Sequence, residues 1–598
     1  MNPPARTDGY APIRDYAAIG DGRTVALVAR DGSIDWLCLP DLDSPSTFGS
    51  LLDADRGGRF LLQPEAPFDS TRRYLRGTNV LETTLATSTG SVRVTDAMTL
   101  PTSGLAPYRE LVRRIEGVTG EVPLRWSVEP RFSYAAVTPR IDVRAGVPVA
   151  ASGRDAIGVL SFDAGDAVRN DGRIEGRFVA RTGTTACLVL TASHQEPLVL
   201  PSRAEVEARL EETVRQWREW ADGREYEGPW ADAVLRSALA LKLLVFAPSG
   251  AIAAAPTTSL PEEIGGERNW DYRYSWPRDS AFVLRALLAL GCGREARAFF
   301  SWLLHASQLT HPEVRVLYRL NGAIDATEES LPLAGYRGSR PVRVGNGAAT
   351  QTQLDVYGEL LDAAAEFARF EGRLDRDHAR RLAGVVDHVC KVWSQPDAGI
   401  WEVRSDPAHF TQSKMMCAVA LDRALALADD GALRGDTARW RRERERIRDF
   451  VETNCYSDAR RSYVRTSDED VLDASLLLGV LGRYDDPRSP RLLGTVDAVR
   501  RELASGPLVR RYEGNDGVAG EDGAFVACSF WLVEAYARQG RADAAAELMD
   551  ELVSLANDVG LYAEEIDPAS GDFLGNFPQA LSHLALVNAA TAVVEAGQ

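Results

Sequence analysis

Three segments of the 598-residue chain gather side chains that suit acid–base chemistry on a polar ligand. Residues 267–280, ERNWDYRYSWPRDS, mix Trp and Tyr with charged side chains and end on Arg278 and Asp279. Residues 394–410, SQPDAGIWEVRSDPAHF, place Glu402 beside Trp401. Residues 560–579, GLYAEEIDPASGDFLGNFPQ, carry Glu564 and Glu565. Segments this rich in both rings and charges fit neither a core strand nor an ordinary solvated loop.

Two carboxyl groups that face each other across an aromatic, Arg-lined pocket are what hydrolysis of a glycosidic bond needs. A carboxyl against an indole ring loses solvation, which raises its pKa and keeps its proton. On that ground we expect Glu402, beside Trp401, to be the general acid and Glu564 to be the base. Spacing alone does not select this pair, because a chain with 86 acidic residues also places surface glutamates beside tryptophans by chance.

The elements that would hold these segments are helical from about residue 229 onward. Apolar residues recurring at helical spacing predict twelve helices there. They are expected at 229–247, 278–291, 293–308, 350–370, 374–393, 411–430, 433–454, 471–482, 487–503, 523–539, 541–558 and 577–596.

The connections between these helices alternate in length. Those after the even-numbered helices are short, as in GCGRE and RQGRA, whereas most of the others are longer and rich in Trp, Tyr, Arg and acids. If successive helices run antiparallel, all the long connections emerge on one face, and six helical hairpins close into an (α/α)6 barrel. The alternative is a helical array with tolerated insertions, but insertions have no reason to alternate. Function commonly lies on loops held by such a scaffold.

The first 200 residues predict strands instead. In RTVALVARDGSIDWLCLP, Asp31-Gly32 separates two apolar runs, which indicates a hairpin. Further short runs between turn residues predict an antiparallel β-sandwich. We therefore expect a β-sandwich domain at 1–201, a linker helix at 202–228 with a strongly charged sequence, and the barrel domain at 229–598.

Composition narrows the function classes. The net charge of −18 disfavours nucleic acid as a partner. No apolar run is long enough to predict a membrane span, and the N-terminus lacks the apolar stretch of a signal peptide, so a cytoplasmic protein is expected. The seven scattered cysteines contain no CxxC, which favours reduced thiols over a disulfide frame or zinc site. P-loop, dinucleotide and metalloprotease signatures are absent, and we assign no cofactor and no metal.

In this order, RNWDYRYSWPRD, GIWEVR and AEEIDP…GNFPQALSHLAL resemble glycoside hydrolase family 15, the glucoamylase, glucodextranase and trehalase family. The segment GDGRTVALVARDGSIDWLCLPDLDSPSTFGSLLD also resembles the opening of its bacterial members. The resemblance implies a β-sandwich before an (α/α)6 barrel, and inverting release of glucose from the non-reducing ends of α-glucosides. It implies that Glu402 is the general acid and Glu564 the general base, with Glu565 as the alternative. The residues it places at the sugar are Tyr272, Trp276, Arg278, Asp279 and Arg511. We also expect Trp401 and Glu565 among the substrate-binding residues.

One departure concerns linkage specificity. Fungal members carry a second Glu directly after the acid, where this chain has Val403. The substrate therefore stays open among trehalose, isomalto-oligosaccharides and maltodextrins, and the loop at 320–347 is expected to shape what lies beyond the first glucose. Two rival functions remain, a disaccharide phosphorylase of similar architecture and a non-catalytic α-glucan-binding protein. The partner is a small carbohydrate, and a homo-oligomer is compatible with the sequence.

Overall fold

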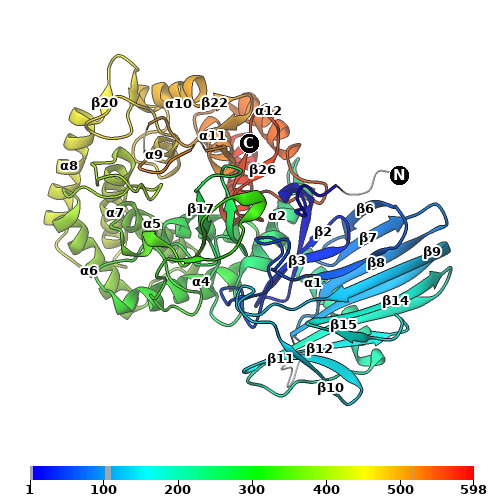
Figure 1. Cartoon of the computed structure of the whole chain (residues 1–598). Helices are drawn as coiled ribbons and strands as arrows, with labels where there is room; N and C mark the ends of the chain where they lie inside the picture. The colour runs from blue at the N-terminus through cyan, green and yellow to red at the C-terminus, as the bar shows by residue number, and fades with distance from the viewer. Residues whose placement is uncertain (1–4, 102–108, 515, 521, 598) are drawn as a thin grey trace.

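The computed structural model of the chain describes residues 5–101, 109–514, 516–520 and 522–597. Strands occupy the first third of the chain and helices the rest, and the two parts lie side by side (Figure 1). The predicted fold class is confirmed: an antiparallel β-sandwich precedes a helical barrel.

The sandwich is organised by one long strand, β9 (Arg109–Val128). Its first half pairs with β8 and β15 and its second half with β5 and β14, all antiparallel, so β9 passes from one sheet to the other. The fifteen strands are β1 Tyr16–Gly20, β2 Val25–Ala29, β3 Ser33–Cys38, β4 Ser46–Phe48, β5 Phe60–Pro64, β6 Asp69–Tyr74, β7 Leu81–Ala86, β8 Gly90–Met98, β9, β10 Arg140–Arg144, β11 Val147–Ser152, β12 Asp155–Phe162, β13 Val168–Asn170, β14 Arg173–Arg181 and β15 Thr185–His194.

The predicted hairpin at Asp31-Gly32 joins β2 to β3, which pair antiparallel. Gly32 has φ +84°, and a Cβ there would lie 2.2 Å from the Leu62 carbonyl oxygen. Only glycine adopts this backbone without strain and fits the space. The turn signal in the sequence therefore has a steric cause in the fold.

A charged helix, α1 (Arg203–Asp222), follows the sandwich. It begins with a capping box, in which the Ser202 side chain accepts from the Glu205 N–H and the Glu205 carboxylate accepts from the Ser202 N–H. Val206, Leu210 and Trp217 are buried on one of its faces. The strong charge of its sequence is thus confined to the other side.

A helix is present at each of the twelve predicted places in the described part of the chain; eleven have ends displaced by a few residues, and the helix expected at 471–482 is reduced to the four residues of α9, Leu478–Leu481. They are α2 Ala231–Leu244, α3 Ser280–Ala289, α4 Gly293–Ala306, α5 Asp355–Glu371, α6 Arg376–Val392, α7 Thr411–Asp429, α8 Thr437–Asn454, α9 Leu478–Leu481, α10 Pro490–Glu502, α11 Val526–Arg538, α12 Ala542–Val553 and α13 Ala580–Ala596. The short α9 continues a 3₁₀ turn over Ala474–Leu477. Five small sheets also lie in the loops of the described barrel. Their strands are β16 Thr258–Pro261, β17 Asn269–Asp271, β18 Glu329–Leu331, β19 Val342–Val344, β20 Tyr456–Ser457, β21 Ser462–Tyr463, β22 Ala504–Ser505, β23 Leu508–Val509, β24 Ala524–Phe525, β25 Glu565–Ile566 and β26 Phe573–Leu574.

Six of these helices form the inner ring of the barrel. Contacts run from α3 to α5, α7, α9, α11, α13 and back to α3. Helices α7, α11 and α13 are buried almost all round, whereas α6, α8 and α10 have one exposed face, as outer helices must. The N-terminal ends of the inner helices follow the long connections, so those loops share one face.

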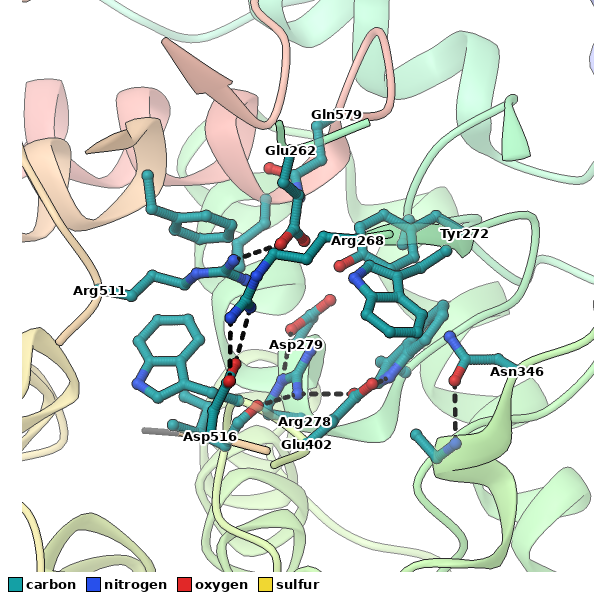
Figure 2. A pocket seen from close by; sticks show the side chains of 18 of the residues that line it. Glu262, Arg268, Tyr272, Arg278, Asp279, Asn346, Glu402, Arg511, Asp516 and Gln579 are labelled. Carbon is teal, nitrogen blue, oxygen red and sulfur yellow. Dashed lines mark hydrogen bonds and ion pairs between the residues drawn. The ribbon is translucent and has the colours of Figure 1, made fainter. Parts of the chain in front are cut away.

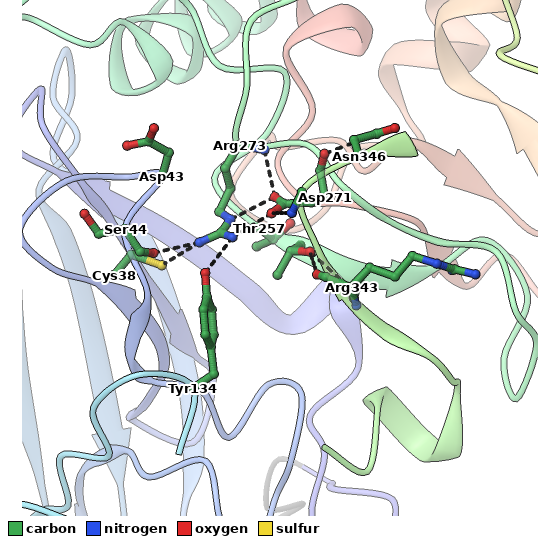
Figure 3. A network of polar contacts seen from close by, with 12 residues as sticks. Cys38, Asp43, Ser44, Tyr134, Thr257, Asp271, Arg273, Arg343 and Asn346 are labelled. Atoms are coloured by element: carbon green, nitrogen blue, oxygen red, sulfur yellow. Dashed lines mark hydrogen bonds and ion pairs between the residues drawn. The ribbon is translucent and has the colours of Figure 1, made fainter. Parts of the chain in front are cut away.

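The sandwich is tied to the first of these loops by Arg273, which is fully buried (Figure 3). Its guanidinium donates to both oxygens of Asp271, at 2.8 and 2.6 Å, and crosses to the Ser44 carbonyl and the Tyr134 hydroxyl, both at 2.7 Å. Asp271 also accepts from the Gly345 N–H at 3.2 Å. One ion pair thus joins the sandwich, the 267–280 segment and the 320–347 loop.

All seven cysteines are buried and unpaired, which agrees with the expected free thiols. Among the residues that the structure describes, no helix combines the length and the apolar character needed to cross a bilayer.

Candidate active site

A pocket opens at the N-terminal ends of the inner helices, on the face that carries the long loops (Figure 2). Its walls come from the loops before α3, α5, α7, α11 and α13. Seven of the nine predicted site residues line it: Tyr272, Trp276, Arg278, Asp279, Trp401, Glu402 and Arg511. The remaining two, Glu564 and Glu565, are 1% and 0% exposed and lie behind the wall.

The 267–280 segment divides its side chains between two directions. Tyr272, Trp276 and Arg278 line the pocket, whereas Asp271 and Arg273 form the buried tie to the sandwich. The rings of Tyr272 and Trp276 pack edge to face, with centroids 5.4 Å apart. The mixture of aromatic and charged residues therefore has two causes, a pocket on one side and the junction with the sandwich on the other.

Glu402 is held in the pocket wall by donors from that segment. Its Oε1 accepts from Trp276 Nε1 at 2.6 Å and from Arg278 Nη1 at 3.0 Å. Its other oxygen, Oε2, has no hydrogen-bond partner within the described ranges, which leaves it available to a ligand. The carboxyl is thus oriented through one oxygen and offers the second.

The backbone at Glu402 is strained. Its φ is +58°, in the left-handed region that residues other than glycine rarely adopt. The Gln351 side chain holds the loop by donating to the Glu402 and Val403 carbonyls at 3.2 and 3.0 Å. Strain of this kind costs on the order of 1 kcal/mol and concentrates at functional sites.

The indole hydrogen-bonded to Glu402 belongs to Trp276, and the sequence neighbour Trp401 has another partner. Trp401 Nε1 donates to both oxygens of Asp473, at 2.8 and 3.0 Å, and its ring stacks on Trp531 with centroids 6.1 Å apart. Adjacent residues of an irregular loop need not point the same way. The argument that Trp401 desolvates Glu402 is therefore replaced by a direct contact with Trp276.

Glu564 is a buried acid beside the pocket, 1% exposed. Burial raises its pKa to about 8, and the negative charge of Glu262 acts in the same direction. Arg511, the Tyr272 hydroxyl and the Asn576 N–H, which donates to Oε2 at 3.3 Å, act against this rise. The second oxygen, Oε1, has no hydrogen-bond partner in the described structure. This result differs from the expectation, because burial raises the pKa of Glu564, the residue that was expected to be the ionised base.

Arg511 neutralises the acids around Glu564. Its Nη2 lies 2.7 Å from Glu262, 2.8 Å from Asp522 and 3.0 Å from Glu565. The ligand oxygens of these three carboxylates approach one another closely enough to hold a metal ion. The guanidinium at hydrogen-bond distance from all three already supplies a cation there, so this group of acids does not fit a metal.

A second arginine closes the same side of the pocket. Arg268 grips Asp516 with two hydrogen bonds, at 2.7 and 2.9 Å, and lies 2.9 Å from Asp522. The Asp516 carbonyl in turn accepts from the Arg404 and Ser405 N–H groups at 2.8 and 3.1 Å. The loop before α11 is thereby tied to the loop that carries Glu402.

Several pocket residues were missed from the sequence. Glu262, Arg268 and Asp516 lie in the long loops that were expected to matter, so closer attention to their charges could have found them. Phe282 and Trp531 lie on inner helices, and helical periodicity does not reveal which end of a helix faces a ligand. Arg404, two residues after Glu402, also lines the pocket, whereas Val403 is buried and faces a neighbouring hollow.

Comparison with known proteins gives consistent results along the whole chain. The profile of the glycosyl hydrolases family 15 matches residues 228–591, and that of a trehalase-like N-terminal domain matches residues 7–199. A trehalase of Mycolicibacterium smegmatis is 40% identical and covers 99% of this chain and 93% of its own. A trehalase of Thermoplasma volcanium is 35% identical over 98% and 94%. The crystal structure of a bacterial glucoamylase complexed with acarbose superposes with a TM-score of 0.73 at 12% identity, covering 99% and 96%, which establishes the shared fold.

Proposed function

The chain belongs to the glycosyl hydrolases family 15, and we propose that it hydrolyses trehalose to glucose with inversion at the attacked carbon. Glu402 is the general acid and Glu564 the general base in this proposal. The observation that carries it is that Tyr272 contacts the surroundings of both acids. Its ring packs on Trp276, which donates a hydrogen bond to Glu402. Its hydroxyl lies close enough to Glu564 to lower the pKa of that carboxyl. The trehalases that match over nearly their whole length support trehalose as the substrate.

The reaction would proceed in one displacement. A proton passes from Glu402 to the oxygen between the two sugars as the bond from that oxygen to the anomeric carbon breaks. Water bonds to the same carbon from the opposite face and gives its proton to Glu564. Arg278 and Asp279, a donor fork beside an acceptor at the start of α3, would bind the hydroxyls of the glucose that is attacked.

Burial of Glu564 has a consequence for this mechanism. The base must be ionised, and a pKa raised to about 8 means that the free enzyme binds a proton at Glu564 at neutral pH and below. Positive charge develops on the sugar ring in the transition state, which favours the ionised form of a nearby carboxyl. The rate should therefore fall on acidification from a higher pH than an ordinary glutamate would give.

Stereochemistry tests the proposal most directly. Inverting hydrolysis of trehalose yields one β-glucose from the attacked ring and one α-glucose from the leaving ring, whereas a retaining enzyme yields two α-glucose molecules. We expect equal amounts of both anomers in proton NMR spectra recorded within the first turnovers, before mutarotation. Two α-glucose molecules would exclude inversion, and no glucose at all would exclude trehalose as the substrate.

Substitution separates the two roles. E402Q and E564Q should each lower kcat on trehalose by about 10²- to 10⁴-fold. E565Q is the matched comparison, because Glu565 is one residue away and bound to Arg511 and the Gly523 N–H. A severe loss in E565Q with an active E564Q would move the role of base to Glu565.

A disaccharide phosphorylase is the rival reaction that the pocket disfavours. Phosphate would need a free cation near the attacked carbon, and Arg268 and Arg511 are both engaged by carboxylates. Formation of glucose 1-phosphate when inorganic phosphate is supplied would favour that reaction over hydrolysis.

A further inference from the structure

Among the arginine–carboxylate pairs of the pocket, Arg278–Asp279 is assigned to the attacked sugar, and Arg268–Asp516 and Arg511–Glu262 build the wall. One further pair, Arg404 with Glu328, has no role yet, and its Glu328 carboxylate lies beside Arg404, outside the pocket lining. Arg404 donates to both oxygens of Glu328 in a fork, at 3.2 and 2.7 Å, and it lines the pocket two residues after Glu402. The side chain of Arg404 is 35% exposed against 15% for Arg278, so this pair lies toward the rim and the other lies deeper.

Glu328 is built to stay in this place. It directly precedes β18 in the 320–347 loop, and it accepts from the Gly347 N–H at 2.9 Å and lies 3.4 Å from Arg343. Burial acts to raise its pKa, but these donors and Arg404 outweigh burial and lower it. Glu328 is therefore an ionised acceptor at neutral pH.

The position of Arg404 is fixed as well. Its guanidinium lies 4.5 Å from the centre of the Trp270 ring, and the guanidinium of Arg343 lies at the same distance from that ring. Stacking on an indole orients a guanidinium plane, and of its five N–H groups the two in the fork donate to Glu328 while the other three remain to donate to a ligand. An arginine with an anchored plane and an ionised acceptor beside it matches the neighbouring hydroxyls of a sugar, as Arg278 and Asp279 do.

We propose that Arg404 and Glu328 bind the second sugar unit of the substrate, the one that leaves with the oxygen protonated by Glu402. This inference rests on the proposed hydrolysis of a disaccharide and assigns its leaving-group site. Trehalose consists of two glucose units joined through their anomeric carbons, so the two sugars present equivalent hydroxyls on either side of the cleaved bond. A second donor–acceptor pair nearer the rim, in addition to the deeper Arg278–Asp279, suits that symmetry. It also assigns the binding of the second sugar to Arg404, which directly follows Val403, the position where fungal members carry a second Glu.

The test compares substrates with and without a second sugar. Trehalose needs the site, whereas α-glucosyl fluoride has no leaving sugar and needs only the inner one. R404A should lower kcat/KM on trehalose by about 10- to 100-fold, as expected for loss of hydrogen bonds to a charged group, and change kcat/KM on α-glucosyl fluoride by less than about threefold. R404K keeps the charge without the fork and should give an intermediate loss on trehalose.

The matched control is R343Q. Arg343 contacts the same tryptophan and the same carboxylate but does not line the pocket, so a merely structural role for these arginines would make R343Q and R404A equivalent. Equal losses on both substrates in R404A, equal defects in R404A and R343Q, or no effect of R404A and R404K on trehalose would each overturn the inference. A wild-type enzyme that cleaves maltose but not trehalose would refute the proposed substrate alone, and the same variants would then be measured on maltose and α-glucosyl fluoride.

Discussion

Glu262, a buried pocket residue with no predicted role, should contribute to the pH dependence of the reaction, after the larger effect of burial on the pKa of Glu564. The negative charge of Glu262 disfavours the ionised form of Glu564. Arg511 forms ion pairs with both Glu262 and Glu565, the residue that follows Glu564. At an effective dielectric constant of about 20, any two like charges separated by about 6 Å repel by about 3 kcal/mol, which corresponds to about two pKa units. Because Arg511 offsets part of this repulsion, we expect E262Q to lower the pKa of Glu564 by about one to two units.

The sign of the effect on activity follows from the role of the base. Glu564 must lose its proton to act, so kcat/KM rises with pH through the pKa of the free enzyme. In the wild type this rise should lie well above the usual pH of a glutamate, toward the value of about 8 for Glu564. In E262Q the whole rise moves to lower pH, and the fraction of maximal activity retained well below the wild-type midpoint should increase by about 10- to 100-fold.

The assay is kcat/KM on trehalose from pH 4 to 9, with glucose release measured in parallel for wild type, E262Q and E263Q. Glu263 is the matched control, since E263Q removes the same charge one residue away without being a cause of the raised pKa. A lower maximal kcat/KM in E262Q would indicate lost contacts to the sugar, and the midpoint of its pH profile can still be measured. An unchanged or higher midpoint in E262Q, or an equal shift in E263Q, would refute the electrostatic reasoning.

Three further outcomes follow from the described contacts. W276F removes the N–H that donates to Glu402 at 2.6 Å, so kcat on trehalose should fall by about tenfold while the melting temperature stays within a few degrees. R273Q leaves Asp271 buried without its ion pair and should lower the free energy of unfolding by about 3–5 kcal/mol in denaturant titrations. Y134F removes only one hydrogen bond to Arg273 and should cost about 1 kcal/mol. Equal small losses in both variants would show that the contact with the sandwich is weak. His583 is fully buried beside Ser237, and burial lowers its pKa from 6.5 to about 3. Below pH 6.5 the unfolded chain therefore binds a proton at this residue that the folded protein does not. The free energy of unfolding should fall as the pH is lowered from about 6.5 toward 3, by up to about 5 kcal/mol. Melting temperatures between pH 6.5 and 4.5 should therefore fall less steeply in H583N than in the wild type, and parallel curves would contradict this.

Local pattern in the sequence was sufficient for much of the architecture. Helical periodicity predicted eleven of the barrel helices closely and the position of the twelfth, the four-residue α9. The alternation of short and long connections predicted that the functional loops share one face. The turn at Asp31-Gly32 and the seven free cysteines were likewise readable, because each depends on neighbouring residues or on composition. Periodicity does not define where a helix starts when the first turn is irregular, so α3 begins after a 3₁₀ turn at Pro277–Asp279.

The chemistry of the site depends on distances that no local pattern encodes. The sequence by itself determined that Glu402 and Glu564 sit on loops of the same face, within motifs of a recognisable family. Only the tertiary structure decided that Trp276 rather than Trp401 binds Glu402, and that Glu262 and burial raise the pKa of Glu564. It also placed Glu328 against Arg404, 76 residues away in the chain. Burial and charge pairing are sums over neighbours from distant segments, so they exist only once the loops have been brought together by the barrel.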